Sequence, residues 1–273
     1  MPELPEVQTV ADTLKNLLSG ATLQKVAFLW PKIAGNMSAE TMASLLTGQT
    51  IRDVTRRAKY ILIRFDAATL IVHLRMEGRF YVKHESDPIA KHSHVLLHLH
   101  DGRRVEYNDT RKFGRFYYYK TDEELSVLDG LGPEPFDPDL LAKHLFKATR
   151  KKKTQLKVWL LNQSNLAGIG NIYADEICHA CRLSPKQPVG RITNKQWEEI
   201  LNQTRFILGQ AIAAGGTTIR TYVSSLGVNG RFQFELHAYG QKGNPCTTCG
   251  TPLKRIVVGQ RGTVYCPSCQ KVR

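Results

Sequence analysis

The segment LAGIGNIYADE, residues 166–176, carries the strongest single indication of the fold. Its two glycines suggest a dinucleotide-binding loop, but no strand precedes Gly168 and the third glycine of that motif is absent. The flanking periodicity is helical over 154–162 and 172–181, which predicts two short helices joined by a tight turn. Asn171 is expected at the N-cap of the second helix, where free backbone N–H groups and the positive dipole end favour a phosphate.

The chain on either side of this segment divides into two kinds of pattern. A longer helix is predicted over 194–213, because Thr193 and Gln196 fit a capping box and two glycines follow its end. The polar segment 217–233 has no clear period and is long for an inert connection, so we expect a functional loop there.

Before residue 130 the pattern is mostly that of short strands after one helix over 5–18. Turn signals separate the strand-like segments, which predicts a sheet sandwich or a barrel. The segments are 60–65, 70–75, 94–100 and 115–119. The linker 129–140, rich in Gly, Pro and Asp, separates this region from the helical one.

The chain contains six cysteines in three C-x-x-C pairs. Two of the pairs lie sixteen residues apart near the C-terminus, a spacing that strongly indicates one closed, tetrahedral and therefore structural Zn²⁺ site. The expected ligands are Cys246, Cys249, Cys266 and Cys269. The third pair, Cys178 and Cys181, lies in a helical pattern, and we interpret it as part of the core.

The formal net charge of +14 favours a polyanionic partner, and nucleic acid is the leading candidate. No apolar run is long enough to cross a membrane and no signal-peptide pattern is present, so a cytosolic protein is expected. The run 143–157 holds seven Lys or Arg residues and no acidic ones. In NDTRKFGRF, Arg111 and Phe113 share one face of an extended chain, which suits contact with bases.

Six motifs, in order over essentially the whole chain, resemble those of bacterial formamidopyrimidine-DNA glycosylases. They are PELPEV, RRAKY, HLRMEG, DTRKFG, LAGIGNIYADE and the four-cysteine finger. Leu4 matches the branch that acts on oxidised purines, whereas the endonuclease VIII branch typically has Gly at that position. Gln8 departs from the family, whose members commonly have Glu there.

The resemblance implies an α+β multidomain fold. Residues 1–130 would form a catalytic β-sandwich domain with flanking helices. Residues 131–235 would form a helical domain with a helix–two-turn–helix unit and a lesion loop, and residues 236–273 a C4 zinc finger holding one structural Zn²⁺.

The implied activity is base excision repair: removal of 8-oxoguanine and formamidopyrimidines from duplex DNA, followed by strand cleavage through β,δ-elimination. Pro2, after removal of Met1, would be the nucleophile that forms a Schiff base, and Glu3 the general acid. Lys59 would serve β-elimination and Arg261, at the glycine-flanked tip of the finger, δ-elimination.

Further residues match the family's binding positions. Those implied to contact DNA are His73, His92, Arg111, Lys152, Lys157 and Asn171. Met76, Arg111 and Phe113 would fill the gap left by the flipped nucleotide. The lesion pocket would use Glu6, Glu77, Ile219, Arg220, Thr221 and Tyr222. A monomer in the bacterial cytoplasm, associated with the nucleoid, is expected, with no membrane partner.

Two alternatives remain open at this point. A zinc-ribbon protein that binds nucleic acid without catalysis would explain the charge and the cysteines, although it does not require PELPEV. A sister glycosylase for oxidised pyrimidines would share most motifs, and Leu4 together with the Met76, Arg111 and Phe113 set argues against it.

Overall fold

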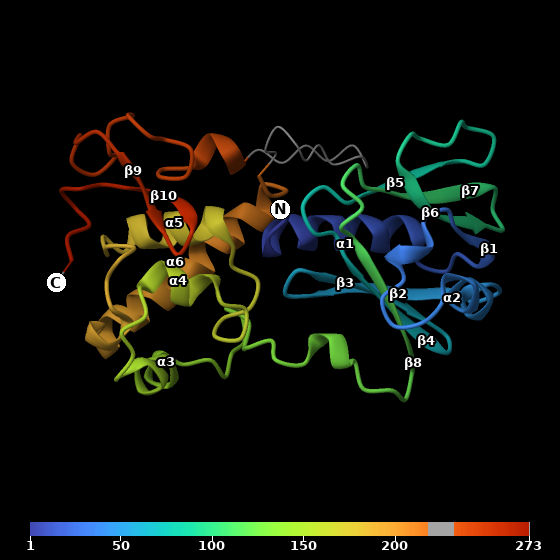
Figure 1. Cartoon of the computed structure of the whole chain (residues 1–273), viewed down its shortest axis with the longest axis horizontal. Coiled ribbons are helices and arrows are strands. Elements are labelled where there is room, and N and C mark those ends of the chain that lie inside the picture. The colour runs from blue at the N-terminus through green and yellow to red at the C-terminus, as the bar shows by residue number, and fades with distance from the viewer. Residues whose placement is uncertain (218–231, 273) are drawn as a thin grey trace. The chain divides into compact units, whose positions relative to one another are not determined.

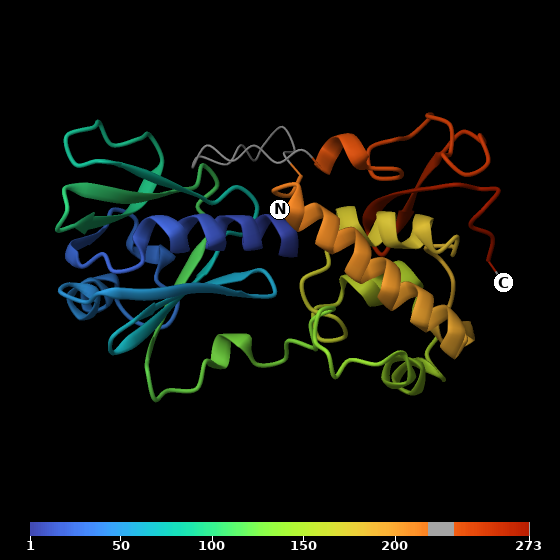
Figure 2. The same cartoon turned by 180° about the vertical axis from the view of Figure 1, so that it is seen from behind.

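The computed structural model describes residues 1–217 and 232–272 of the chain. It contains two compact units (Figures 1 and 2). Within the described residues, 1–129 and 215–217 belong to the first unit and 130–214 and 232–272 to the second. The predicted three-domain division is a finer partition and stays a prediction.

The first unit is a sandwich of two four-stranded antiparallel sheets, with strand orders β1-β6-β7-β5 and β2-β3-β4-β8. Its helical elements are α1 (Leu4–Leu18), η1 (Pro31–Ile33), α2 (Ala39–Leu46) and η2 (Ser126–Leu128). Its strands are β1 (Leu23–Phe28), β2 (Ile51–Arg57), β3 (Tyr60–Phe65), β4 (Ala68–His73), β5 (Arg79–His84), β6 (Ser93–Leu99), β7 (Arg103–Asn108) and β8 (Arg115–Lys120).

The core of this unit forms because alternate strand residues point inward. Ile61 and Ile63 of β3 are fully buried and join one cluster with Val95 and Leu97 of β6. The apolar face of α1 joins the same cluster, and α1 packs along β2 and β3 (Figure 1). Strand β4 is buried along its whole length, because η2 and neighbouring apolar side chains cover its outer face. The predicted sandwich is therefore confirmed.

The second unit is helical and ends in a β-hairpin. Its elements are α3 (Ala142–Thr149), α4 (Leu156–Leu161), α5 (Asn171–Ala180), η3 (Val189–Arg191), α6 (Asn194–Ala213), η4 (Phe232–Glu235), β9 (Lys254–Val258) and β10 (Arg261–Tyr265). The capping box at α6 is present as predicted: Gln196 N–H donates to Thr193 Oγ1 at 3.2 Å, and Thr193 N–H to Gln196 Oε1 at 2.9 Å. None of the helices in the described part of the chain combines the length and the apolar character needed to span a bilayer.

The turn between α4 and α5 is braced by one side chain that sequence patterns did not single out. The amide nitrogen of Gln163 donates to the carbonyls of Leu161 and Ile169, and its oxygen accepts from Gly168 N–H. Gly168 has φ +101°, a value that favours glycine. Helix α5 begins at Asn171 with Gly170 as its cap, one residue earlier than expected.

Candidate active site and metal centre

The start of α1 brings the two carboxylates of PELPEV into buried positions. Pro2 is buried, and Glu3 and Glu6 are only 2% and 4% exposed. Glu3 N–H donates to Glu6 Oε2 at 2.8 Å, a helix-capping contact. Glu6 Oε1 also accepts from the N–H and the hydroxyl of Thr217, at 2.8 and 2.9 Å. Glu6 therefore fixes the segment that precedes residue 218.

The predicted lesion-pocket residues divide into two groups. Ile219, Arg220, Thr221 and Tyr222 lie outside the described residues. Glu77 is half-buried after β4, in the same loop as Met76.

Lys59 and His73 lie close to each other at the ends of β3 and β4. Lys59 is 5% exposed and follows Ala58, whose φ of +52° makes the tight β2–β3 turn. The edge of Tyr60 packs on the His73 ring, with centroids 4.6 Å apart. Burial, followed by the charges of Arg75 and Lys59, lowers the pKa of His73 to about 3. His73 is therefore neutral at pH 7, and because its Nδ1 accepts from Arg75 N–H at 2.9 Å, its proton is on Nε2.

The three residues expected to fill the DNA gap come together on two loops. The Arg111 guanidinium lies over the Phe113 ring, 4.6 Å from its centroid, and its Nη1 is 3.0 Å from Met76 Sδ. Met76 and Phe113 are 40% and 45% exposed, which is unusual for large apolar side chains. The trio is thus an exposed, mutually supported cluster.

Asp109 organises the loop that carries Arg111 and Phe113, a role that the sequence motif contained but did not reveal. Its side chain is fully buried. Oδ1 accepts from Arg111 N–H at 3.0 Å, and Oδ2 accepts from the N–H groups of Phe113 and Gly114, both at 2.8 Å. These bonds fix the backbone under the exposed cluster.

The hydroxyl of Tyr107 lies close to the backbone of both loops, at Gly78 and Gly114. A Cβ atom at Gly78 would lie 2.1 Å from Tyr107 Oη, and one at Gly114 only 1.8 Å from it. Glycine is required at both positions, because any side chain would displace the tyrosine or the loop.

A surface cavity of about 390 Å³ adjoins this cluster. It is lined by Met1, Arg75, Met76, Phe113 and Arg115. The first residue of the chain therefore shares one cavity with two members of the exposed trio. The sequence motifs that supply these residues are far apart, and the sandwich brings them together.

Strained backbone marks the neighbourhood of several predicted site residues. Non-glycine residues with positive φ include Ala58 before Lys59, Arg75 before Met76, His92 itself, Lys112 between Arg111 and Phe113, and Gln260 before Arg261. Such conformations cost about 1–3 kcal/mol each and persist where the surrounding structure imposes them, often at functional sites.

In the second unit, the structure gives Lys157 a position that differs from the expected DNA contact. Its side chain is fully buried, and its ammonium donates to Asp175 Oδ1, Thr263 Oγ1 and the Gly262 carbonyl at 2.6, 2.8 and 3.0 Å. All three protons are used, so no donor remains for a phosphate. Burial raises the pKa of Asp175 to about 6 against the opposing effect of the Lys157 charge, which leaves the carboxylate ionised at pH 7.

The buried pair instead joins α4 and α5 to the hairpin. Asp175 Oδ2 accepts from Val264 N–H at 3.0 Å, and Asn171 Nδ2 donates to the Gly262 carbonyl at 3.2 Å. Arg261, at the start of β10, is exposed and lies next to this junction. The residue that follows the predicted tip arginine, Gly262, is therefore hydrogen-bonded to the first residue of α5.

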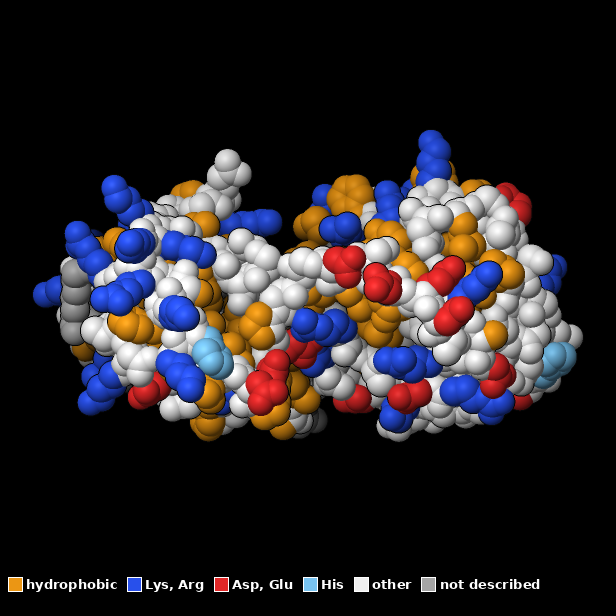
Figure 3. Space-filling model, turned by 90° about the horizontal axis from the view of Figure 1, so that it is seen from below, with side chains coloured by type: hydrophobic (Ala, Val, Ile, Leu, Met, Phe, Trp, Pro, Cys, Tyr) orange, Lys and Arg blue, Asp and Glu red, His pale blue; other side chains and the backbone are white. Residues whose placement is uncertain are grey.

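Lys152 and the other basic residues in and just after α3 are exposed to solvent. The exposed cations are Lys143, Lys147, Arg150, Lys151, Lys152 and Lys153. Figure 3 views the molecule from below, the side on which α3 lies in Figure 1, and on that face of the second unit Lys and Arg gather with few acidic neighbours. His92, in the first unit, is also exposed.

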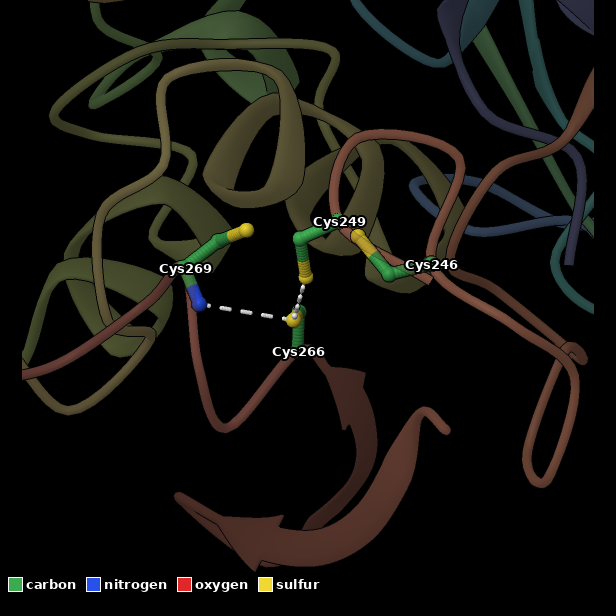
Figure 4. Close-up of side chains that lie close together, drawn as sticks. All are labelled: Cys246, Cys249, Cys266 and Cys269. Carbon is green, nitrogen blue, oxygen red and sulfur yellow. Dashed lines mark hydrogen bonds between the residues drawn. The ribbon is translucent and has the colours of Figure 1, made fainter. Parts of the chain in front are cut away.

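The four C-terminal cysteines converge on one point (Figure 4). Their sulfur atoms all lie within 4.8 Å of one another, and Cys249 Sγ is 3.5 Å from Cys266 Sγ. Sulfurs about 3.8 Å apart are what a tetrahedral ion with 2.3 Å metal–sulfur bonds needs, so the set fits a structural metal ion. Cys269 N–H donates to Cys266 Sγ at 3.4 Å, which supports a charged sulfur.

The other cysteine pair does not join this cluster, which is the one group of at least three potential ligands among the described residues. Cys178 is 1% exposed, and burial raises the pKa of its thiol well above the usual range. Cys181 is half-buried, and burial raises its pKa to about 12. The interpretation of Cys178 as a core residue is therefore confirmed. The raised pKa values keep both cysteines in the thiol form.

Comparison with known proteins matches this geometry over the whole chain. Family models match in order: the formamidopyrimidine-DNA glycosylase N-terminal domain over 1–116, the formamidopyrimidine-DNA glycosylase H2TH domain over 131–223, and a zinc finger found in FPG and IleRS over 243–272. The formamidopyrimidine-DNA glycosylase of Bacillus anthracis is 44% identical, with 99% of each chain covered.

Solved structures agree. Lactococcus lactis Fpg, in complex with DNA containing an abasic site, has a TM-score of 0.92 and 35% identity, with 98% of this chain and 99% of that chain covered. MutM bound to DNA containing carbocyclic 8-oxo-G has a TM-score of 0.93 and 34% identity, with 99% and 100% covered. Together with the paired loops, the buried PELPEV start and the cysteine cluster, these full-length matches show that the chain belongs to the formamidopyrimidine-DNA glycosylase family.

Proposed function

We propose that this protein is a bifunctional DNA glycosylase and abasic-site lyase of base excision repair. Its proposed substrates are 8-oxoguanine and formamidopyrimidines in duplex DNA, and abasic sites. The bacterial cytoplasm, where the chromosome lies, is the proposed place of action. The observation that most directly supports this proposal is the cavity that Met1 shares with Met76 and Phe113. The cavity puts the N-terminus beside residues suited to replacing a flipped nucleotide.

Chemistry at Pro2 requires loss of Met1. With Met1 attached, the Pro2 nitrogen is a tertiary amide and has no available lone pair. Met1 is 48% exposed at the cavity, so its removal would place a secondary amine at the cavity wall. A free α-amine has a pKa of about 7.7–8.0, so only about a tenth to a sixth of it is neutral at pH 7. Transfer of its proton to the neighbouring Glu3 would provide both the nucleophile and the acid.

In the proposed reaction, the Pro2 nitrogen forms a bond to C1′ and the glycosidic bond breaks, with its electron pair leaving on the base, which takes up the proton that remains on the nitrogen. Glu3 returns a proton to the sugar ring oxygen as the C1′–oxygen bond opens, which gives an iminium ion. That ion withdraws electrons, so loss of a C2′ proton expels the 3′ phosphate and a later proton loss expels the 5′ phosphate. Lys59 and Arg261 are proposed to assist the first and second eliminations.

Extrusion of the damaged nucleotide costs a few kcal/mol of stacking and pairing. The exposed Met76, Arg111 and Phe113 cluster is proposed to offset part of that cost by filling the gap. The exposed side chains of Lys152 and His92 would bind phosphates, together with neutral His73 through its Nε2–H. The buried Lys157 is instead proposed to hold the hairpin, because its protons are already used.

The proposed metal is one structural Zn²⁺ held by Cys246, Cys249, Cys266 and Cys269, the donor set that this ion prefers. The bound ion supplies folding stability rather than a catalytic position, since four thiolates leave no open site. The protein's contribution is the hairpin that the finger stabilises, with Arg261 at the start of its second strand, β10.

The test is borohydride trapping of the imine on duplex DNA containing 8-oxoguanine. Wild-type protein should give a covalent adduct and a mass that lacks Met1. Pro2→Gly should lose excision far more than DNA affinity. Pro5→Ala is the matched control, because it alters a proline of the same peptide at the start of α1 and should keep the adduct.

Two results would refute parts of the proposal. No adduct from wild type, under conditions that trap a known lyase, would exclude the imine mechanism and favour a non-catalytic DNA-binding protein. Excision of thymine glycol in preference to 8-oxoguanine would show that the protein acts on oxidised pyrimidines rather than oxidised purines.

A further inference from the structure

His179 of α5 lies against one of the four clustered cysteines. Its Nε2 is 3.4 Å from Cys246 Sγ, a hydrogen-bonding distance for sulfur, and the two residues are 6% and 3% exposed. They are 67 positions apart in the sequence. The C-x-x-C spacing identifies the ligands but carries no information about this neighbour.

A metal-bound cysteine is a thiolate, which accepts hydrogen bonds and cannot donate them. The nearby ring nitrogen must then carry a proton, and both the neutral Nε2–H tautomer and the imidazolium satisfy this requirement. We propose that His179 is an outer-shell hydrogen-bond donor to the metal ligand Cys246 and that this bond helps the finger retain its ion. The inference rests on the proposed Zn²⁺ and is independent of the proposed catalytic mechanism.

The surrounding contacts hold this geometry in place. Glu176, almost one turn earlier on α5, accepts from the N–H groups of His237, Ala238 and Tyr239 at 2.9, 2.9 and 2.8 Å. Its carboxylate thereby fixes the chain that leads into the first cysteine pair. Because one helix supplies both the clamp and the donor, the His179–Cys246 distance is set by α5 rather than by the finger alone.

Two of the other sulfurs have hydrogen-bond partners within the finger. Cys249 Sγ lies 3.3 Å from the Thr251 hydroxyl, and Cys266 Sγ accepts from Cys269 N–H at 3.4 Å. Cys246 differs in that its donor comes from a helix about seventy residues earlier. A hydrogen bond spreads the charge of a thiolate, and outer-shell partners of this kind change metal affinity by about 10- to 100-fold.

The finger is accessible from a cavity on the side where His179 lies. A cavity of about 600 Å³ is lined by His179, His237, Phe206, Thr247 and Thr248, among others. Thr247 and Thr248 are the two residues between Cys246 and Cys249. A chelator can therefore approach the first pair, and His179 both lines that cavity and contacts the Cys246 sulfur.

The experiment measures zinc retention in the full-length protein, without any activity assay. His179→Phe keeps a ring and removes the donor, whereas His179→Gln places an amide N–H near the former Nε2. The matched control is His237→Phe, which changes the ring stacked on His179 at 6.4 Å. Zinc content is measured by elemental analysis and the dissociation constant by competition with a colorimetric chelator.

His179→Phe should bind zinc about 10- to 100-fold more weakly, with His179→Gln and His237→Phe within about threefold of wild type. In Co²⁺-substituted protein, the sulfur-to-metal charge-transfer band should shift in His179→Phe only. NMR of wild type should show a proton on His179 Nε2, a readout that does not depend on how any variant folds.

Equal zinc affinity of His179→Phe and wild type, or an unprotonated Nε2, would overturn the role of His179 while leaving the zinc site intact. Wild-type protein that carries no zinc would overturn the metal assignment and the inference with it.

Discussion

Asp109→Asn is the sharpest test of how the loop under the Arg111 and Phe113 cluster is built. The carboxylate is fully buried and accepts three backbone N–H groups, at 3.0, 2.8 and 2.8 Å. An asparagine has one acceptor oxygen. In its better orientation it keeps the bonds to Phe113 and Gly114, and its NH₂ group then faces the Arg111 N–H.

The magnitude follows from that count. One bond to a charged group is lost, worth about 1.5–3 kcal/mol, and the two that remain become neutral and weaker. We therefore expect about 2–3 kcal/mol less protection of the loop. At about 1.4 kcal/mol per factor of ten, amide exchange at residues 111–114 should accelerate roughly 30- to 150-fold.

Hydrogen exchange with mass spectrometry on the peptide spanning this loop is the direct assay. Affinity for a duplex that contains a stable abasic analogue is the functional one, and it should fall about tenfold or more. Asp122→Asn is the control, because Asp122 is an exposed carboxylate on the same unit. Exchange and affinity of Asp109→Asn that match those of Asp122→Asn would refute the reasoning.

Two further predictions concern the first unit. The folded chain keeps His73 neutral, because its pKa is about 3, whereas the unfolded chain takes up a proton below about pH 6.5. The free energy of unfolding should therefore fall as the pH is lowered from about 6.5 towards 3. In urea titrations over this range, His73→Gln should reduce the slope of the unfolding free energy against pH by up to ~1.4 kcal/mol per pH unit. An unchanged slope would contradict this. Gln8 accepts from Arg56 Nε and donates to Asp12 Oδ1, both at 2.8 Å, whereas a glutamate at this position could only accept. Gln8→Glu should lower the unfolding free energy by about 0.5 kcal/mol, and adding Asp12→Ser should restore it; stabilisation by the single change would show that the Arg56 bond dominates.

Local pattern was sufficient for most elements of this fold. The segment 60–65 was predicted as one of several short strands separated by turn signals and is β3. Helix α6 has the predicted bounds because its cap and its stop signal are local. Helices α2 and α3 were not predicted, since each has only eight residues and short helices give weak periodicity. The departure at Gln8 was noted from sequence, but its compensation by Asp12 and Arg56 required the structure.

The sequence by itself determined the family, the strand and helix types, and the four-cysteine cluster, because these depend on spacing along the chain. Only the tertiary structure decided what became of individual charged groups. Lys157 lies in a basic run and was expected on DNA, yet it meets Gly262 and Thr263 more than a hundred positions away and is buried. Glu6 meets Thr217 across 211 positions, and His179 meets Cys246 across 67. A charged side chain takes its role from the acceptors and donors around it, and those are chosen when distant segments pack.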